Sequence, residues 1–306
     1  MMVISGRIDR PVPAIAVVMP VYNRASVVRR AIDSALAQEF TDFELVVVDD
    51  GSTDGTPEIV LAIDDPRVRL VPLDSNRGGN AARNHGIRAA TAPLIAFLDS
   101  DDVYLPQKLG TIVGIFGRRP ELDVLLDSFA KLQPAWRGHR LVERRNAVIE
   151  TNQEFVAALF ARRLWKATPA ITIRREAAFR AGLFDETMKR RQDFEFLVRA
   201  AKVARCASTD QILWHKIGSR DAISADPDTF VAATVELYRR HPQYLGNSDF
   251  RPGLARDITR HFLRNVSGLK VRSSLRDARR LAAEFGSLRL LGLLLEGGRE
   301  LIVRRR

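Results

Sequence analysis

The sequence predicts an α/β protein in which a mixed, mostly parallel sheet is flanked by helices and followed by a C-terminal helical extension. Apolar strand-like runs alternate with helix-like segments over residues 14–224, which is typical of a parallel sheet covered on both faces. Acidic clusters follow two of these apolar runs directly, as ligand-binding residues do in open α/β sheets. Beyond Ser224 only helical periodicity remains.

The individual elements follow from apolar runs bounded by turn residues. Asn23 or Ser26 is expected to cap a first helix that continues to Leu36. The other expected helices cover residues 57–63, 78–90, 230–240, 254–266, 274–285 and 288–303, and residues 190–196 are expected to open a further amphipathic helix. The expected strands cover residues 14–19, 43–48, 68–71, 94–98, 124–126, 170–173 and 211–214.

Charge divides the chain into unequal parts. The 306 residues carry a net charge of +11, and residues 237–306 alone contain 16 Lys and Arg against 6 Asp and Glu. We therefore divide the chain into an N-terminal tail (1–13), a catalytic domain (14–224) and a basic helical region (225–306). The tail has no apolar segment of the kind found in a signal peptide.

Composition also indicates the compartment. Cys206 is the single cysteine, so no internal disulfide forms and nothing points to an oxidising environment. The longest strongly apolar stretch, Leu288–Leu295, is far shorter than the roughly 20 residues of a spanning helix. We expect a cytoplasmic protein, either free or peripheral on the inner face of the cytoplasmic membrane.

The acidic clusters indicate a divalent metal bound together with a phosphorylated ligand. Asp49 and Asp50 end one apolar run, and Asp99 and Asp101 end another. Carboxylates gathered at one sheet edge repel each other unless a cation lies among them. An Asp-x-Asp in extended backbone turns both carboxylates to one side, where they suit Mg²⁺ or Mn²⁺ that also binds substrate phosphates.

Other side chains at the same sheet edge are candidates for nucleotide binding. The Tyr22 ring and the Asn23 amide could support a nucleobase, and Asp50 could accept its imide N–H. Arg77 and Arg83, near a glycine-rich helix start, could reach a diphosphate. The segment after Asp50 resembles a calcium-binding loop only at its start, because its twelfth position is occupied by Leu61 instead of Glu. The ordinary alternative is that these residues serve as turn, cap and surface residues.

In order and spacing, these motifs resemble those of family 2 of the glycosyltransferases, the inverting enzymes with the GT-A fold. The resemblance covers about two thirds of the chain, from about Ala14 to Ser224. It rests on Val18-Met19-Pro20-Val21-Tyr22-Asn23, Val47-Val48-Asp49-Asp50-Gly51-Ser52, Ala82-Arg83-Asn84-His85-Gly86-Ile87, Phe97-Leu98-Asp99-Ser100-Asp101-Asp102, Gly182-Leu183-Phe184-Asp185-Glu186 and Gln192-Asp193.

The resemblance implies transfer of a sugar from a nucleotide-diphosphate donor, with UDP favoured, to a hydroxyl of a carbohydrate or lipid-linked acceptor. Asp193 is then the catalytic base and Asp101 the metal ligand for Mn²⁺ or Mg²⁺, with Asp99 as a second ligand. Ser219 stands where the family often carries a histidine ligand, so His215 is retained only as an alternative. The expected donor-binding residues are Pro20, Tyr22, Asn23, Asp50, Arg77, Arg83, Asp99 and Ser100.

Three other functions fit parts of the sequence. A nucleotidyltransferase would use the same fold and metal but needs a basic, glycine-rich loop near the first strand, where the sequence has Pro20-Val21-Tyr22-Asn23-Arg24. A non-catalytic carbohydrate- or nucleotide-binding protein would have lost Asp101 or Asp193, and both are present. The basic C-terminal region lacks interleaved aromatic residues and any known nucleic-acid module, so we expect no specific nucleic-acid partner.

The basic C-terminal region carries two further hypotheses. Leucines and arginines alternate over residues 288–306, as in a helix that lies on an anionic membrane surface. Apolar stripes at helical spacing equally suit packing onto the catalytic domain or a homodimer contact.

Overall fold

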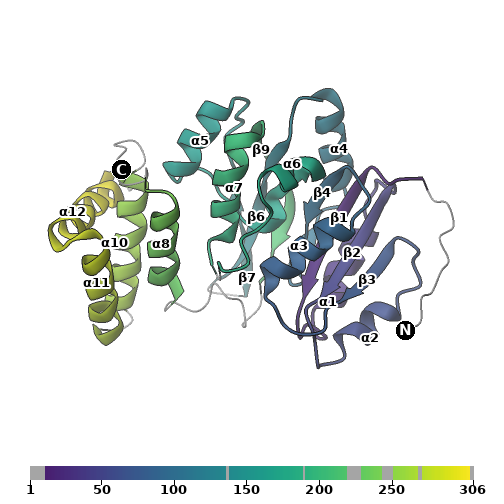
Figure 1. Ribbon diagram of the computed structural model, residues 1–306, viewed down its shortest axis with the longest axis horizontal. Helices are drawn as coiled ribbons and strands as arrows, with labels where there is room; N and C mark the ends of the chain where they lie inside the picture. Colours follow the sequence, from purple (N-terminus) through teal and green to yellow (C-terminus); the bar gives the residue numbers. More distant parts are fainter. Residues whose placement is uncertain are drawn as a thin grey trace.

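The protein is built on a nine-stranded sheet in the order β3-β2-β1-β4-β8-β6-β9-β5, with β7 paired to β6 (Figure 1). The computed structural model describes residues 11–135, 138–188, 190–218, 229–242, 251–267 and 271–303. The strands are β1 (Ile15–Val21), β2 (Phe43–Asp49), β3 (Val68–Pro72), β4 (Leu94–Phe97), β5 (Val103–Tyr104), β6 (Val124–Pro134), β7 (His139–Arg144), β8 (Ile171–Arg174) and β9 (Cys206–Lys216).

The first half of the sheet is parallel, as the sequence predicts. β1 pairs in parallel with both β2 and β4, and β3 extends the sheet in parallel beyond β2. Strands β1, β2 and β4 are almost entirely buried, which explains why each reads as a continuous apolar run. Their carboxyl ends therefore meet at one edge, where the acidic clusters follow.

The second half of the sheet is mixed. β8 lies antiparallel to both β4 and β6, β7 is antiparallel to β6, and β5 is antiparallel to β9, while β6 and β9 run in parallel. The expectation of a mostly parallel sheet thus holds for the first half only. β6 and β9 are much longer than predicted because polar residues continue both strands beyond their apolar parts.

Helices cover the sheet and continue beyond it (Figure 1). Gly86 allows one of them, α3, to lie close to β1 and β2, because a Cβ at this position would meet Val18 Cγ1 at 2.3 Å. The catalytic-domain helices are α1 (Val28–Leu36), α2 (Thr56–Leu61), α3 (Gly79–Ala89), α4 (Lys108–Arg118), α5 (Asn152–Phe160), α6 (Arg175–Arg180) and α7 (Gln192–Val203), with a 3₁₀ turn at Thr168–Ala170.

The C-terminal helices pack together at the end of the molecule away from β3 (Figure 1). They are α8 (Thr229–Arg240), α10 (Arg251–Ser267), α11 (Val271–Phe285) and α12 (Ser287–Val303). Ile258, Leu281 and Leu293 are buried among them, so part of the apolar stripe is core. Within the described ranges, no helix is both long and apolar enough to cross a membrane. Residues 1–10 and the expected domain boundary at 224 lie outside the described residues.

Candidate active site

Asp50, at the end of β2, holds the loop that leads into α3. Its two carboxylate oxygens accept hydrogen bonds from the backbone N–H groups of Arg77 and Gly78, each at 2.8 Å. Asp50 is buried by these contacts. The Arg77 side chain is half exposed and reaches Glu186 at 3.3 Å. Asp50 therefore shapes the sheet edge that we expect to bind the donor, and its role toward a base stays a prediction.

The loop after β1 presents an exposed aromatic ring at the same edge. Tyr22 is 42% exposed. Its neighbour Asn23 has a positive φ of 51°, and its Oδ1 accepts the N–H of Thr53 at 2.8 Å. The prediction that Asn23 or Ser26 caps the first helix is wrong, since α1 begins after Val27 and no described side chain caps it. Asn23 joins two loops at the sheet edge instead.

Asp99 is oriented by a buried arginine. Arg83 Nη2 donates to Asp99 Oδ1 at 2.7 Å, and the Arg83 side chain is 8% exposed. Arg83 Nη1 also contacts Asn80 Oδ1 at 3.3 Å, while Asn80 Nδ2 donates to the carbonyl oxygens of Asp185 and Met188, both at 2.8 Å. In this structure Arg83 therefore binds a carboxylate of the Asp-x-Asp motif. Its predicted contact with a diphosphate stays a prediction.

Asp102, the last carboxylate of the acidic cluster, lies inside the protein. It is fully buried, and its Oδ1 accepts the backbone N–H groups of Ile217 at 2.9 Å and Gly218 at 3.3 Å. Its Oδ2 has no hydrogen-bond partner among the described residues and lies 4.0 Å from Lys216 Nζ. Asp102 thus joins the turn after β4 to the end of β9.

Burial and the charge of the partner residue have opposite effects on the pKa values of Asp102 and Lys216. Burial raises the pKa of Asp102 to about 7, with Lys216 opposing the rise and Asp99 and Asp101 adding to it. Burial alone would lower the pKa of Lys216, but the surrounding carboxylates, led by Asp102, raise it above its ordinary value. Lys216 therefore stays positively charged beside the Asp-x-Asp motif.

The acidic cluster fits a divalent cation that takes its remaining ligands from a substrate. Among the described residues, no three His, Cys, Asp or Glu side chains form a metal-binding group. Asp99 and Asp101 retain partly accessible carboxylates, and Mg²⁺ typically binds through one or two carboxylates plus substrate phosphates. His215 stands next to Lys216 on β9, so its side chain points to the opposite face of the strand. This position makes it a poor third ligand.

A cavity of about 480 Å³ is lined both by Asp193, the predicted base, and by Asp99, predicted to bind the donor and a metal. Asp99 follows β4 and Asp193 lies in the first turn of α7, yet both line this cavity. The other lining residues come from β6, β7, β9, the segment between α5 and β8, the start of α7 with the residues before it, and the C-terminal helices. They are Phe129, Lys131, Gln133, Arg144, Arg162, Trp165, Lys166, Thr168, Arg190, Arg191, Gln192, Phe194, Lys216, Phe230, Asp257 and Arg264, with Ala167.

Asp193 is positioned by the start of α7. The residue before the helix, Arg191, adopts a left-handed backbone with φ of 64°, and no side chain in the described ranges caps the helix start. Asp193 Oδ1 accepts the N–H of Phe194 at 2.8 Å. Asp193 is thus half-buried in the first helical turn, within the cavity. Asp193 is not the N-cap of α7, because that position is occupied by Arg191.

The C-terminal region forms part of the cavity wall, which the sequence did not indicate. Asp257 on α10 pairs with Arg162, accepting its Nε at 2.8 Å, and lies 3.6 Å from Arg191 Nη2. Although burial would raise it, the pKa of Asp257 is held far below its usual range by Arg162 and Arg191. Burial, together with Arg162 and Arg191, lowers the pKa of Lys166 to about 7, against the charges of Asp193 and Asp257.

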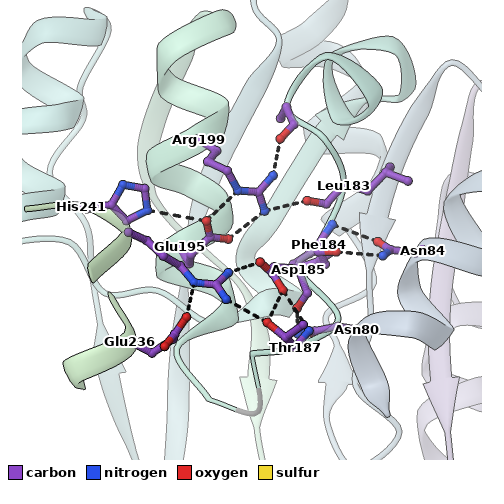
Figure 2. Close-up of polar contacts among 12 residues, drawn as sticks. Asn80, Asn84, Leu183, Phe184, Asp185, Thr187, Glu195, Arg199, Glu236 and His241 are labelled. Carbon is purple, nitrogen blue, oxygen red and sulfur yellow. Dashed lines mark hydrogen bonds and ion pairs between the residues drawn. The ribbon is translucent and has the colours of Figure 1, made fainter. Parts of the chain in front are cut away.

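A second polar network fastens α8 to the catalytic domain (Figure 2). Glu195 on α7 pairs with Arg199 at 2.6 Å, and His241 Nε2 lies 3.5 Å from the same carboxylate. Arg240, at the end of α8, pairs with Asp185 and donates to Thr187 Oγ1 at 2.8 Å. The turn that carries Asp185 also contacts α3 through Asn80 (Figure 2). These contacts therefore hold α8 against α7 and against the turn that carries Asp185.

Of the expected site residues, only Asp99 and Asp193 line the cavity within the described part of the chain. Pro20 is paired with Val48 within the sheet, and Ser100 is buried beside the motif. Lys216 and Asp102 were not among the expected site residues, although the acidic motif itself was a signal for Asp102, the last of its three carboxylates. Nothing local in the sequence marked Asp257.

Comparison with known proteins agrees with this arrangement. The sequence profile of glycosyl transferase family 2 matches residues 16–186. The succinoglycan biosynthesis protein ExoO of Rhizobium meliloti (strain 1021) is 54% identical over 102 residues, which are 33% of this chain and 29% of ExoO. The matched segments span about a third of the length of the first curated relatives.

Solved structures show the same fold at low sequence identity. TarS 1-349 of S. aureus in complex with UDP-GlcNAc superposes with a TM-score of 0.64 and 21% identity, covering 88% of this chain and 81% of TarS 1-349. The mannosyltransferase PcManGT of Pyrobaculum calidifontis, in complex with GDP-Man and Mn²⁺, superposes with a TM-score of 0.58 and 20% identity. The match covers 95% of this chain and 81% of PcManGT. The predicted GT-A fold is therefore confirmed, and the chain belongs to glycosyl transferase family 2.

Proposed function

We propose that this protein is an inverting, metal-dependent glycosyltransferase that moves a sugar from a nucleotide-diphosphate sugar, with UDP favoured, to a hydroxyl acceptor. One observation carries the proposal: Asp99 and Asp193, from opposite halves of the catalytic domain, line a single cavity. A carboxylate beside the metal-binding motif and a second carboxylate in the same cavity suit a single displacement at an anomeric carbon, the first near the leaving diphosphate and the second as the base.

Asp193 is the base in this proposal. It removes the proton from the acceptor hydroxyl as the oxygen attacks the anomeric carbon on the side opposite the diphosphate. A positioned base of this kind typically contributes about 10²- to 10⁴-fold to the rate. Because the bond to the diphosphate breaks as the new bond forms, the anomeric configuration inverts.

The departing diphosphate gains negative charge, and the cationic side of the cavity stabilises it. Lys216 lies beside the acidic motif and retains its proton, so it can donate to a phosphate oxygen. A divalent cation held by Asp101, with Asp99, would neutralise the same charge when bound. Arg83 holds the Asp99 carboxylate in position for this role.

Binding of nucleotide and metal tests the donor assignment. We expect UDP with Mn²⁺ to raise the thermal midpoint of the unaltered protein, because a ligand at a hundredfold excess over Kd adds about 2.7 kcal/mol to stability. Asp101→Ala should remove the Mn²⁺-dependent part of this shift while the protein stays folded. GDP and dTDP, measured beside UDP, identify the base.

The control is Asp42→Ala, which removes an exposed carboxylate before β2, at the opposite edge of the sheet. It should leave the ligand-induced shift unchanged. Equal Mn²⁺-dependent UDP affinity in the Asp101→Ala variant and the unaltered protein would show that the metal assignment is wrong.

The proposed pathway is the synthesis of a cell-surface polysaccharide or glycolipid. The relative ExoO is named for succinoglycan biosynthesis, and structural neighbours hold UDP-GlcNAc or GDP-Man with Mn²⁺. In this proposal the enzyme acts in the cytoplasm on a carbohydrate or lipid-linked acceptor.

The C-terminal helices are proposed to contact the anionic inner face of the cytoplasmic membrane, where a lipid-linked acceptor would lie. Leu291 and Leu295, one turn apart on α12, are 55% and 63% exposed, whereas Leu290 and Leu293 are buried. Arg289 and Arg299 are exposed on the same helix. Each basic residue near an anionic surface contributes about 1 kcal/mol to binding.

Liposome co-sedimentation tests the membrane contact. We expect the protein to pellet with anionic vesicles and not with neutral ones, and Leu291→Gln/Leu295→Gln to lower the pelleted fraction several-fold. These substitutions change exposed side chains only, so the helix packing is kept. Leu61→Gln, an equally exposed leucine on α2, is the control. Equal recovery with neutral vesicles, or loss of a dimer in the double variant without any vesicle effect, would contradict the proposal.

A further inference from the structure

Three cations in the active-site cavity lack an acidic partner within the described part of the chain. They are Lys131 on β6, Arg144 on β7 and Lys166 before β8, and all three line the cavity. Among the residues that the structure describes, none of these three side chains forms an ion pair or a hydrogen bond, whereas Lys216 lies near Asp102 and Arg162 pairs with Asp257. Lys131, Arg144 and Lys166 are called the cationic wall below.

The cationic wall is fixed in place by the surrounding sheet. In the strand register, Lys131 of β6 lies opposite Lys216 of β9, and Arg144 of β7 lies opposite Phe129 of β6. The Phe129 ring stacks on Trp214 at 4.5 Å between centroids. Strand pairing therefore fixes the backbone positions of two of the three cations, Lys131 and Arg144.

A buried asparagine connects the third cation to this sheet. Asn146, just after β7, accepts the N–H of Trp165 at 2.7 Å and donates to its carbonyl oxygen at 3.0 Å. The Arg144 guanidinium lies 4.4 Å from the centroid of the Trp165 ring, and Lys166 Nζ lies 4.9 Å from that of Phe194. Asn146 thus holds the backbone of Trp165, whose ring lies beside Arg144, while Lys166 lies at the Phe194 ring of the same cavity.

Like charges held this close destabilise one another. Burial, together with Lys216 and Arg144, lowers the pKa of Lys131, while Asp102 opposes the shift. Lys166 experiences burial and the charges of Arg162 and Arg191. Such an arrangement is relieved when an anion binds. In the proposed function the diphosphate of the donor lies beside the acidic motif, near Lys216, so the cationic wall is left for a second anion.

We propose that the cationic wall binds an anionic group, a carboxylate or a phosphate, on the acceptor, with Trp165 offering a flat apolar surface to the sugar that carries it. This proposal rests on the proposed function, since it names the class of acceptor for the same site. Trp165 is 45% exposed although it lies at the cavity, so its ring is open to a ligand. Asp193 lines the same cavity and is one of the charges that acts on Lys166, which places the base on the acceptor's side.

The test compares three methyl glycosides that differ only in the group at C6, which is neutral in one and anionic in the other two. Methyl β-glucoside, methyl β-glucuronide and methyl β-glucoside 6-phosphate are titrated by NMR into protein saturated with UDP and Mn²⁺. We expect a charged glycoside to bind at least about tenfold more tightly than the neutral one, as a charge-assisted hydrogen bond provides. The tighter of the two charged glycosides distinguishes a carboxylate from a phosphate.

Variants locate the effect. Lys131→Gln and Arg144→Gln should each lower the preference for the charged glycosides about tenfold and leave UDP affinity unchanged. Arg88→Gln is the matched control, because Arg88 is exposed at the end of α3, at the opposite edge of the sheet. Equal binding of all three glycosides would overturn the proposal. So would a parallel loss of UDP affinity in Lys131→Gln and Arg144→Gln, which would assign these cations to the donor.

Failure of the proposed function gives a different result. It would appear as an absence of Mn²⁺-dependent UDP binding in the unaltered protein. The glycoside titrations are therefore repeated without nucleotide. A charge preference that persists there and disappears in Arg144→Gln supports the anion site independently of the donor.

Discussion

The two halves of the catalytic domain share one sheet but satisfy their buried polar groups differently. In the first half, residues 15–104, carboxylates accept backbone N–H groups from adjacent loops, as Asp50 does from Arg77 and Gly78. In the second half, residues 108–216, two fully buried charged side chains meet, Lys108 of α4 and Asp127 of β6, whereas the Arg83–Asp99 pair of the first half keeps a partly exposed carboxylate. The first arrangement shapes a binding edge, whereas the second creates a charged cavity.

This difference indicates how the work is divided in the proposed reaction. Loops held by backbone hydrogen bonds suit a donor whose nucleotide is the same in every cycle. The cavity, in contrast, takes cations from β6, β7 and the C-terminal helices, which lie outside the parallel half of the sheet. The second half is therefore where acceptor specificity should be found.

The largest expected effect comes from Asp193→Asn, which removes the proposed base from the second half. The amide keeps the size of the side chain but cannot accept the proton, so the rate of sugar transfer should fall about 10²- to 10⁴-fold. Affinity for UDP with Mn²⁺, measured by isothermal titration, should stay the same if the donor depends on the first half.

Glu176→Gln serves as the control, because Glu176 is an exposed carboxylate on α6. A near-normal transfer rate in Asp193→Asn would refute the assignment of the base. A collapse of UDP affinity in that variant would erase the proposed division between the two halves.

Sequence predicted the first half well because its strands are encoded locally. Each of β1, β2 and β4 is an apolar run followed by polar turn residues, and the structure places them within a few residues of the expected bounds. The Asp-x-Asp motif could be found for the same reason, since it directly follows such a run. In this half, the local sequence pattern is enough to locate both the strands and the acidic motif that follows one of them.

The second half was predicted poorly because its strands carry polar residues that only tertiary contacts explain. β6 continues through Asp127 and Ser128, whose partners lie on α4 and β9, so the apolar pattern ends long before the strand does. Helix α4 was missed because its helical apolar spacing is interrupted by Gly110, Gly114 and Gly117. The contribution of Asp257 to the cavity arises from a contact with Arg162, 95 residues away in the chain.

A large loss of stability is expected for Lys108→Met. Lys108 and Asp127 are both fully buried, Lys108 Nζ also donates to the carbonyl oxygen of Pro169 at 3.1 Å, and Trp214 Nε1 donates to Asp127 at 2.9 Å. Removing the cation leaves Asp127 as an uncompensated buried charge, which typically costs about 3–5 kcal/mol. The midpoint of urea unfolding should fall accordingly.

The double variant Lys108→Met/Asp127→Asn tests the cause. Because it removes the charge as well as its partner, it should recover part of the lost stability. If the single variant unfolded at the same urea concentration as the unaltered protein, the buried pair would not stabilise the second half, and the contrast between the halves would be lost.

The smallest expected effect is that of Gly86→Ala, which tests how tightly α3 packs onto the parallel half of the sheet. A Cβ at Gly86 would lie 2.3 Å from Val18 Cγ1 and 3.2 Å from Val48 Cγ2, and both valines are fully buried. Overpacking of this kind costs about 1–3 kcal/mol. The higher helix propensity of alanine returns about 1 kcal/mol at most, so the free energy of unfolding should fall.

Gly117→Ala is the matched control, since Gly117 is exposed on α4 and a Cβ added there would meet no atom of the described residues within 4 Å. Alanine at this position gains the helix propensity without a clash, so stability should rise by up to about 1 kcal/mol. Val18→Ala added to Gly86→Ala makes room for the new methyl group and should restore part of the loss. If Gly86→Ala and Gly117→Ala shifted the urea midpoint in the same direction, the close contact between α3 and β1 would not be what requires glycine at position 86.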